Sequence, residues 1–400
     1  MNPSAAAPKK GRLRVGIVTS EAFDYRLTNL GGFGKAGSNL ARLFSSCPEL
    51  GIDASWVMPR HYAPNDRSAA LPLLHGCEVV WRKHPIAAFR RALREARFNM
   101  LIAIDFQSIY RLPIWLLPRV PVLFWLRDPW SPEDKSRMAT LKTPDDSATA
   151  TQGLFSRNLR SFRFDVLAAK LTGRRLAYAA PAELVFRRIP STYGFRPRTT
   201  HLLPNFHLGG GNPGPRAEQP TVLFVGRFDP VKRPWIVHEI ARRMPDIRFK
   251  MAGATQLKGP GAWNPHPTPP NVTYLGLIDG EAKAAAFSRA WVLLNTSIHE
   301  GLPITFQEAL AFGVPIVSAL DPDEVASRFG RYVGQELGDG VAAVPRFVAA
   351  LRELIGSNEM RTSLGGRGRE WVESVHTEEN FIKAFGKICC ELGLSWRPRK

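Results

Sequence analysis

The segment HEGLPITFQEALAFGVP occupies residues 299–315 and carries two carboxylates, Glu300 and Glu308, separated by seven residues. A short apolar run at 291–294, typical of a buried strand, precedes it. The middle of the segment has the composition of a helix, which Gly313 ends just before the next apolar run. The order therefore predicts a strand, a glycine turn, a helix that contains a carboxylate, and a second strand, as in a parallel βαβ unit.

Such a unit has a specific chemistry at the start of its helix. Free N–H groups at a helix N-terminus attract phosphate. A carboxylate one turn deeper, here Glu308, can accept hydrogen bonds from two vicinal hydroxyls. The alternative is an amphipathic helix with two solvent-facing carboxylates, but the complete order of strand, turn, helix and strand favours the binding interpretation.

The same alternation of short apolar runs and helical patterns continues along the 400 residues, which predicts an α/β fold with parallel sheets. Helices are expected at about 342–356 and 378–392. We expect strands near 14–19, 54–58, 99–104, 121–126, 176–180 and 199–203, and then near 221–225, 247–251, 272–275, 291–294 and 315–318.

A Gly/Pro-rich stretch at residues 204–215 divides this pattern into two halves. We expect two Rossmann-like, doubly wound domains that face each other across a cleft, where ligands of such sheets bind. The expected division is a first domain at 1–205, a linker at 206–220, a second domain at 221–376, and a C-terminal helix at 377–400 that packs back on the first domain.

A glycine-rich stretch, GGFGKAG at residues 31–37, fits the dinucleotide fingerprint G-x-G-x-x-G but lacks its context. Eleven residues separate the first expected strand from Gly31, and no carboxylate follows the second strand to bind a ribose. NAD binding is therefore disfavoured. The glycines still allow backbone N–H groups to approach an anion at the start of a helix, and the stretch is a candidate lid.

The charge is concentrated in the first half of the chain. Residues 1–200 hold 31 of the 54 Lys/Arg and 15 of the 35 Asp/Glu, so +16 of the formal charge of +19 lies there. The excess represents either ordinary solvated helix faces or a surface for an anionic partner, such as an anionic membrane surface. Arg91, Arg94 and Arg97 recur at helical spacing beside apolar residues, which suits a membrane-skimming helix and a domain-packed helix equally.

Several other classes of protein and site are disfavoured. No secretory signal precedes the first strand, no run is long and apolar enough to span a membrane, and four scattered cysteines suit a reduced cytoplasmic protein. Asp321 and Asp323 form a D-x-D sequence that is more typical of a surface turn, with Asp323 as a helix cap, than of a metal site. We expect no metal.

The segment at 299–315 resembles the E-x7-E motif of GT-B glycosyltransferases, especially the retaining family 4 group. The stretch 224-FVGRFDPVK-232 is similar to the "vGR…K" element of that family, residues 203–205 resemble its "lPN", and residues 31–34 resemble its glycine loop. The resemblance covers about residues 12–390 and is stronger in the C-terminal half. It implies a GT-B fold, a nucleotide-sugar donor as substrate, no cofactor, and an acceptor that is a glycan or is lipid-linked.

The resemblance also implies roles for individual residues. Arg227 and Lys232 would grip the donor diphosphate and neutralise the charge of the leaving group, as electrostatic catalysis requires. Glu300 would hold the donor sugar and Glu308 the ribose. The remaining donor-binding residues implied by the motifs are Gly31, Gly32, Gly34, Gly226, Gly301, Leu302, Pro303 and Ile304.

The chain departs from the family pattern in its first half. Where family members often carry a histidine that reaches the donor sugar, this sequence has Arg127 and Asp128, and either of them faces the sugar or only shapes the loop. The expected function is sugar transfer from a nucleotide-diphosphate donor, with retention and without metal, on the inner membrane face or in the cytoplasm. The alternatives are a GT-B-fold nucleotide-sugar epimerase and a non-catalytic module, for example one that binds nucleic acid, although no recognition motif supports nucleic acid.

Overall fold

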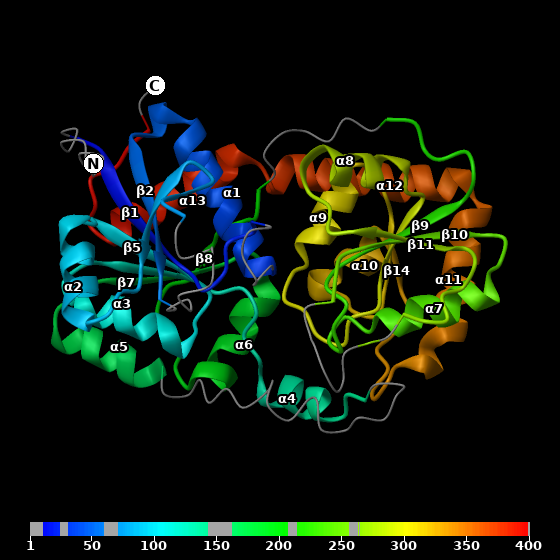
Figure 1. Cartoon of the computed structure of the whole chain (residues 1–400), viewed down its shortest axis with the longest axis horizontal. Coiled ribbons are helices and arrows are strands. Elements are labelled where there is room, and N and C mark those ends of the chain that lie inside the picture. Colours follow the sequence, from blue (N-terminus) through cyan, green and yellow to red (C-terminus); the bar gives the residue numbers. More distant parts are fainter. Residues whose placement is uncertain are drawn as a thin grey trace.

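The computed structural model describes residues 11–24, 31–59, 71–142, 162–206, 214–255, 263 and 265–398. Figure 1 shows two α/β domains side by side, each with a sheet in its interior and helices around it. All strand pairs of both sheets are parallel except one at the edge of the first sheet. This architecture confirms the prediction of two Rossmann-like, doubly wound domains.

The N-terminal sheet has eight strands in the order β3-β4-β2-β1-β5-β6-β7-β8. Only β3 and β4 pair antiparallel. Because β1 lies between β2 and β5, the winding reverses at its C-terminal end, where ligands of such sheets bind. The strands are β1 (Leu13–Val18), β2 (Ile52–Met58), β3 (Leu73–Leu74), β4 (Cys77–Trp81), β5 (Met100–Ile104), β6 (Val122–Trp125), β7 (Leu176–Ala180) and β8 (His201–Leu202).

The C-terminal sheet has six parallel strands in the order β11-β10-β9-β12-β13-β14. Here the winding reverses between β9 and β12, which carry the two motifs of the second half. The strands are β9 (Thr221–Val225), β10 (Arg248–Ala252), β11 (Val272–Gly276), β12 (Val292–Asn295), β13 (Ile316–Ser318) and β14 (Gly330–Tyr332).

Helices cover both faces of each sheet (Figure 1). Those of the N-terminal domain are α1 (Gly32–Ser46), α2 (Ile86–Glu95), α3 (Arg111–Leu116), α4 (Pro132–Ala139), α5 (Phe162–Leu171) and α6 (Glu183–Tyr193). After β8 the chain continues with α7 (Pro234–Arg243), α8 (Gly280–Arg289), α9 (Ile304–Ala311), α10 (Val325–Arg328), α11 (Val344–Gly356), α12 (Asn358–Val375) and α13 (Glu378–Glu391).

The last helix, α13, belongs to the core of the N-terminal domain although it follows the C-terminal one in sequence. The ring of Phe381 lies 5.7 Å from that of Trp125, and the ring of Phe385 lies 5.8 Å from that of Phe44. His376, just before α13, contacts the backbone oxygen of Asn205 through Nδ1 at 2.9 Å. The chain therefore joins the two domains twice, and residues 207–213 of the expected linker lie outside the described residues.

Three strands and one helix show why some elements were not expected from the sequence. The strands β3, β4 and β14 are short or only partly buried, so they lack a clear apolar run. Helix α12 contains Gly365, Gly366 and Gly368, which disfavour a helix by propensity. Tertiary packing explains it: Gly365 lies against the backbone of Gly313, and Gly368 lies against Leu310 of α9.

The structure also shows which side of the basic helix α2 is buried. Phe89 and Leu93 are fully buried, and Phe98 beyond the helix is 8% exposed, so the apolar side of α2 packs into the core. Arg91, Arg94 and Arg97 are exposed. Of the two interpretations of this helix, the structure supports the domain-packed one.

Candidate active site

A cavity lies between the two domains at the C-terminal ends of their sheets. Of the thirteen residues that the sequence nominated, twelve line it, and only Gly34 does not. The N-terminal domain contributes Glu21, Phe23, Gly31, Gly32, Phe33, Lys35, Arg127 and Asp128. The C-terminal domain contributes, among others, Gly226, Arg227, Lys232, Lys283, Glu300, Gly301, Leu302, Pro303, Ile304 and Glu308.

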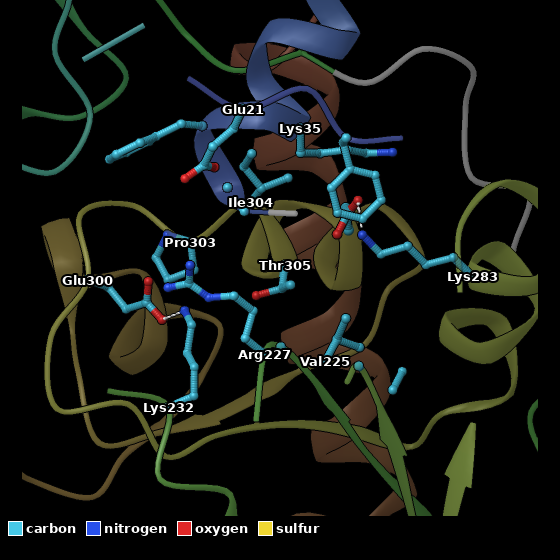
Figure 2. A pocket seen from close by; sticks show the side chains of 18 of the residues that line it. Glu21, Lys35, Val225, Arg227, Lys232, Lys283, Glu300, Pro303, Ile304 and Thr305 are labelled. Atoms are coloured by element: carbon cyan, nitrogen blue, oxygen red, sulfur yellow. Dashed lines mark hydrogen bonds and ion pairs between the residues drawn. The ribbon is translucent and has the colours of Figure 1, made fainter. Parts of the chain in front are cut away.

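Arg227 and Lys232 follow β9 and are oriented by one buried carboxylate, Asp229. Its Oδ2 atom lies 2.9 Å from Nε of Arg227, and its Oδ1 atom accepts a hydrogen bond from the backbone N–H of Lys232 at 3.0 Å. Figure 2 shows the side chains of Arg227 and Lys232 entering the cavity from the same wall. Sequence analysis missed Asp229 although it lies inside the quoted motif, because only the cations of the motif were assigned a role.

Glu300 follows β12 and already has two partners. Its carboxylate forms an ion pair with the ammonium of Lys232 (Figure 2) and accepts a hydrogen bond from Oγ of Ser297 at 2.7 Å. Its side chain is 14% exposed. The pair places opposite charges next to each other on the cavity wall, within reach of both a phosphate and a sugar hydroxyl.

The N-terminus of α9 opens into the same cavity. Pro303 is the N-cap residue and no side chain caps the first turn. The first-turn residues Ile304 and Thr305 line the cavity, so the uncapped N–H groups are available to an anion there. The expected helix of the E-x7-E segment is thus present, with Glu308 one turn inside it.

Glu308 is held by a lysine that the sequence did not nominate. Nζ of Lys283 in α8 donates to Oε1 of Glu308 at 2.7 Å, and both side chains are 11% exposed. The second carboxylate oxygen, Oε2, is buried and has no hydrogen-bond partner. This oxygen can therefore accept a hydrogen bond from a hydroxyl of a bound ligand.

A second lysine, Lys35 of α1, crosses from the other domain. Its Nζ atom lies 2.6 Å from Oδ1 of Asp279, which precedes α8, and a guanidinium nitrogen of Arg42 lies 3.6 Å from Oδ2. Burial, and then the nearby charge of Lys283, lower the pKa of Lys35. These ion pairs tie α1 to the helix that carries Lys283.

The glycine loop leads into the first turn of α1, with Gly31 as the N-cap residue. The carboxylate of Glu21, which follows β1, lies against this turn: its Oε2 accepts from the backbone N–H of Gly34 at 3.3 Å. A Cβ on Gly31 would overlap the same carboxylate. Gly34 packs against residues 21–23 instead of lining the cavity, and residues 25–30, which precede the candidate lid, lie outside the described residues.

At the position where family members often have a histidine, Asp128 of the N-terminal domain pairs with His299 of the C-terminal domain. Oδ1 of Asp128 lies 2.8 Å from Nε2 of His299, whose Nδ1 lies 3.3 Å from Oδ1 of Asp134. Arg188 continues the network, since its Nε lies 3.2 Å from Oδ2 of Asp134 and it donates to the backbone oxygen of Glu300 at 2.9 Å.

These charges determine the protonation of the network. Burial opposes the charged form of His299, but the carboxylates of Asp128 and Asp134 raise its pKa to about 9. Burial likewise opposes the ionised form of Asp134, and the contact with His299 lowers its pKa well below the usual range. At neutral pH the network therefore holds an imidazolium between two carboxylates.

Arg127 and Asp128 both line the cavity, but the guanidinium of Arg127 is engaged elsewhere. The guanidinium of Arg127 lies over the ring of Trp125 at 4.7 Å and donates to Oδ1 of Asn205 at 2.6 Å, on the core side of β6. Arg127 is 5% exposed. Its part in the cavity wall is therefore backbone and stem.

The D-x-D sequence has a different role from the expected one. Asp321 accepts from the backbone N–H groups of Ala326 and Ser327 and so caps α10. Asp323 caps a helix of the other domain: it accepts from the backbone N–H groups of Glu183 and Leu184 at 2.7 and 2.9 Å, at the start of α6. The expectation that Asp323 caps the following helix is wrong, because its carboxylate binds the start of α6 across the domain boundary, where its φ is +49°.

Comparisons with known proteins agree with this geometry. Residues 212–371 match the model of a family described as glycosyl transferases group 1. A trehalose synthase from Rubrobacter xylanophilus is 28% identical over 189 residues, which cover 42% of each chain. The chain thus matches less than half the length of this curated relative.

Two solved structures resemble the chain over nearly its whole length. Sucrose-phosphate synthase from Thermosynechococcus elongatus superposes with a TM-score of 0.69 at 15% identity, covering 96% of this chain and 99% of that one. Anabaena Alr3699/HepE, solved in complex with UDP-glucose, superposes with a TM-score of 0.65 at 14% identity, covering 95% and 100%. At these identities the likeness establishes the two-domain fold.

Proposed function

We propose that the protein transfers a sugar from a nucleotide-diphosphate donor to an acceptor, starting from the match of residues 212–371 to the family described as glycosyl transferases group 1. The observation that carries the proposal is the convergence on one cavity of Arg227, Lys232, the uncapped start of α9 and the unpartnered oxygen of Glu308. Cations and free N–H groups suit a diphosphate, and the carboxylate suits a ribose.

The proposed reaction depends on position and charge. Arg227, Lys232 and the α9 N-terminus stabilise the negative charge that develops on the leaving diphosphate while the anomeric carbon becomes oxocarbenium-like. When the donor binds, the ion pair separates: Glu300 turns to the hydroxyls of the donor sugar, and Lys232 turns to the phosphate. Asp128, held by His299, faces the sugar from the N-terminal domain.

Retention of the anomeric configuration and independence from metal are part of this proposal. Their support is the resemblance of residues 299–315 to the retaining E-x7-E group and two cations positioned where a metal would otherwise act. The leaving phosphate then takes the proton of the acceptor hydroxyl, and no cofactor takes part. We also propose that the acceptor is a glycan or is lipid-linked, and that the protein works in the cytoplasm, in part on the inner membrane face. Within the described residues no helix is long and apolar enough to cross a bilayer.

A thermal-shift panel of UDP-, GDP- and ADP-sugars tests the donor site and identifies the base. We expect one class to raise the melting temperature and Glu308→Ala to abolish the shift with little loss of intrinsic stability. An unchanged shift in Glu308→Ala would remove the assigned role of Glu308. Activity that survives EDTA, together with the anomeric configuration of the product by NMR, tests metal independence and retention.

The two alternative functions have their own readouts in the same experiments. An epimerase would convert the nucleotide sugar without any acceptor. A nucleic-acid-binding module would bind RNA tightly at physiological salt and show no shift with any nucleotide sugar.

A further inference from the structure

Helix α5 exposes an apolar stripe on the side that faces away from the core. Phe164, Leu167, Ala168 and Leu171 follow the spacing i, i+3, i+4, i+7 and therefore share one face of the helix. The three large side chains are 59%, 53% and 81% exposed. The opposite face holds Phe162 and Ala169, which are buried, so this helix is apolar on both sides. A helix that only packed on its own domain would carry polar residues outside.

A tryptophan of the neighbouring helix extends the stripe. Trp115 of α3 is 59% exposed, and its Nε1 donates to Oδ1 of Asp165 in α5 at 3.0 Å, which fixes the indole beside that helix. We name Trp115, Phe164, Leu167 and Leu171 the α3–α5 face. These are four of the ten exposed large hydrophobic side chains in the described part of the chain. Isolated exposed hydrophobic residues are ordinary, but a contiguous group signals an interaction site.

The surroundings of the α3–α5 face are basic. Arg163 and Lys170 are exposed along one side of the stripe. Figure 1 shows α2, α3 and α5 lying next to one another on one side of the N-terminal sheet, and α2 adds the exposed Arg90, Arg91 and Arg94. The three helices carry six basic residues and two acidic ones, of which Asp165 is neutralised by Arg111 at 2.8 Å.

We propose that the α3–α5 face docks the protein on an anionic lipid surface, with Phe164, Leu167 and Leu171 in the outer acyl region, Trp115 at the headgroup level and the arginines on the lipid phosphates. Apolar residues with an interfacial tryptophan and a basic rim are the composition of peripheral membrane helices. Both signals are needed, since a short apolar face or a few charges alone bind weakly. The inference extends the membrane attachment proposed above by naming its surface, and it does not require that the chain transfers a sugar.

Two features of the α3–α5 face favour lipid over protein. The stripe is ten residues of helix, about 15 Å long, whereas a stable protein interface needs about 20–30 residues on each side. A second copy of this chain would also bring two basic rims together, which is unfavourable. An anionic bilayer accepts a small apolar insertion and a wide basic surround at once.

The test is flotation of the full chain with phosphatidylcholine vesicles, with and without phosphatidylglycerol, at low and at physiological salt. We expect binding to the anionic vesicles that weakens with salt. The double variant Leu167→Glu/Leu171→Glu should lower the partition coefficient about tenfold or more, because two apolar groups leave the bilayer. Arg163→Gln/Lys170→Gln should lower binding to the anionic vesicles only.

The matched control is Leu337→Glu, which changes an equally exposed leucine (51%) of the C-terminal domain and should bind as the wild type does. All substituted side chains are exposed, so circular dichroism and the melting temperature should stay unchanged. The shift with nucleotide sugars should also persist in every variant, which separates failure of this proposal from failure of the proposed function.

Three results would overturn the proposal. The first is an absence of binding to either kind of vesicle. The second is equal binding of the Leu167→Glu/Leu171→Glu variant and the wild type. The third is a wild-type dimer that this variant converts to a monomer, which would assign the face to a protein partner.

Discussion

Gly301 of the C-terminal domain lies directly against the carbonyl oxygen of Arg127 in the N-terminal domain, so closely that a Cβ on Gly301 would overlap that oxygen. Gly301 follows Glu300 and Arg127 precedes Asp128. The backbone contact therefore brings the loop after β12 against the loop after β6 and sets the distance between the two acidic side chains that line the cavity from opposite domains.

Gly301→Ala should force these loops apart. We expect a loss of about 1–3 kcal/mol in the free energy of unfolding, as for other overpacked contacts. Sugar transfer should fall at least tenfold in kcat/KM, because a small displacement of the two walls misplaces the donor. Gly356→Ala is the control, since a Cβ there meets no atom within 4 Å. Wild-type kinetics in Gly301→Ala would show that the contact does not position the site.

Much of the fold was predictable from the hydrophobic periodicity of the sequence and from the glycines and prolines that end helices and strands. The expected strands coincide within one or two residues with β1, β2, β5 to β7 and β9 to β13, because central strands of parallel sheets are continuous apolar runs. The elements that escaped detection include the edge strands β3 and β14, the mostly half-buried strand β4, and the glycine-containing α12. Their stability comes from contacts with residues distant in sequence, which local propensity does not encode.

The residues of the candidate site also fall into those that the sequence predicted and those that it did not. Residues within the two motifs of the second half were nominated directly, and the structure gathers them at one cavity. Lys283 and Glu21 lie outside every quoted motif, and Lys35 lies in the glycine stretch at 31–37, of which only the glycines were nominated. The approach of these three residues in space reveals them. His299 was visible beside Glu300, but its two carboxylate partners lie about 170 residues earlier in the chain.

Asp229 should act through the two cations that it orients. In Asp229→Ala, Arg227 loses its ion pair and the turn before Lys232 loses its hydrogen bond, so both cations become free to leave the diphosphate. We expect kcat to fall about 100-fold, the scale of losing one electrostatic catalyst. Asp229→Asn keeps an oxygen for the backbone N–H of Lys232 and should recover part of kcat. Equal losses in the two variants would contradict an orienting role.

Lys283 should position Glu308, the carboxylate that we propose binds the ribose. Lys283→Met removes the donor to Oε1 of Glu308 and leaves a carboxylate that is 11% exposed without its counter-charge. We expect the Kd of the nucleotide-sugar donor to rise about tenfold, equivalent to about 1.4 kcal/mol, with a smaller change in kcat at saturation. Isothermal titration calorimetry measures the first quantity. Lys387→Met, at an exposed lysine of α13, is the control.

Stability should fall as the pH rises from about 6.5 to about 9. The pKa of His299 is raised to about 9 in the folded protein, against 6.5 for an ordinary histidine. Its contribution is therefore complete below pH 6.5 and is lost as the pH rises through 9, because the unfolded chain releases the proton first. The shift corresponds to about 3 kcal/mol.

Chemical denaturation at a series of pH values measures this effect. Asp128 and Asp134 contact the imidazole, and because their pKa values are lowered, both carboxylates stay ionised throughout that window. In His299→Gln the slope between pH 6.5 and 9 should largely disappear. The control is His201→Gln, which removes a histidine paired with Glu391 at the surface and should preserve the slope. A wild-type slope in His299→Gln would assign the effect to another group.

Adjacent glycines of α12 provide the strictest test of how this helix is stabilised. A Cβ on Gly365 would overlap the carbonyl oxygen of Gly313, which ends the helix α9 that carries Glu308, whereas a Cβ on Gly366 meets no atom within 4 Å. Gly365→Ala should therefore lower the free energy of unfolding by about 1–3 kcal/mol. Gly366→Ala should raise it by about 0.5–1 kcal/mol, because alanine is the better helix former. Both follow from denaturant titration, and changes of the same sign would mean that propensity, and not the close approach of α12 to α9, governs this part of the fold.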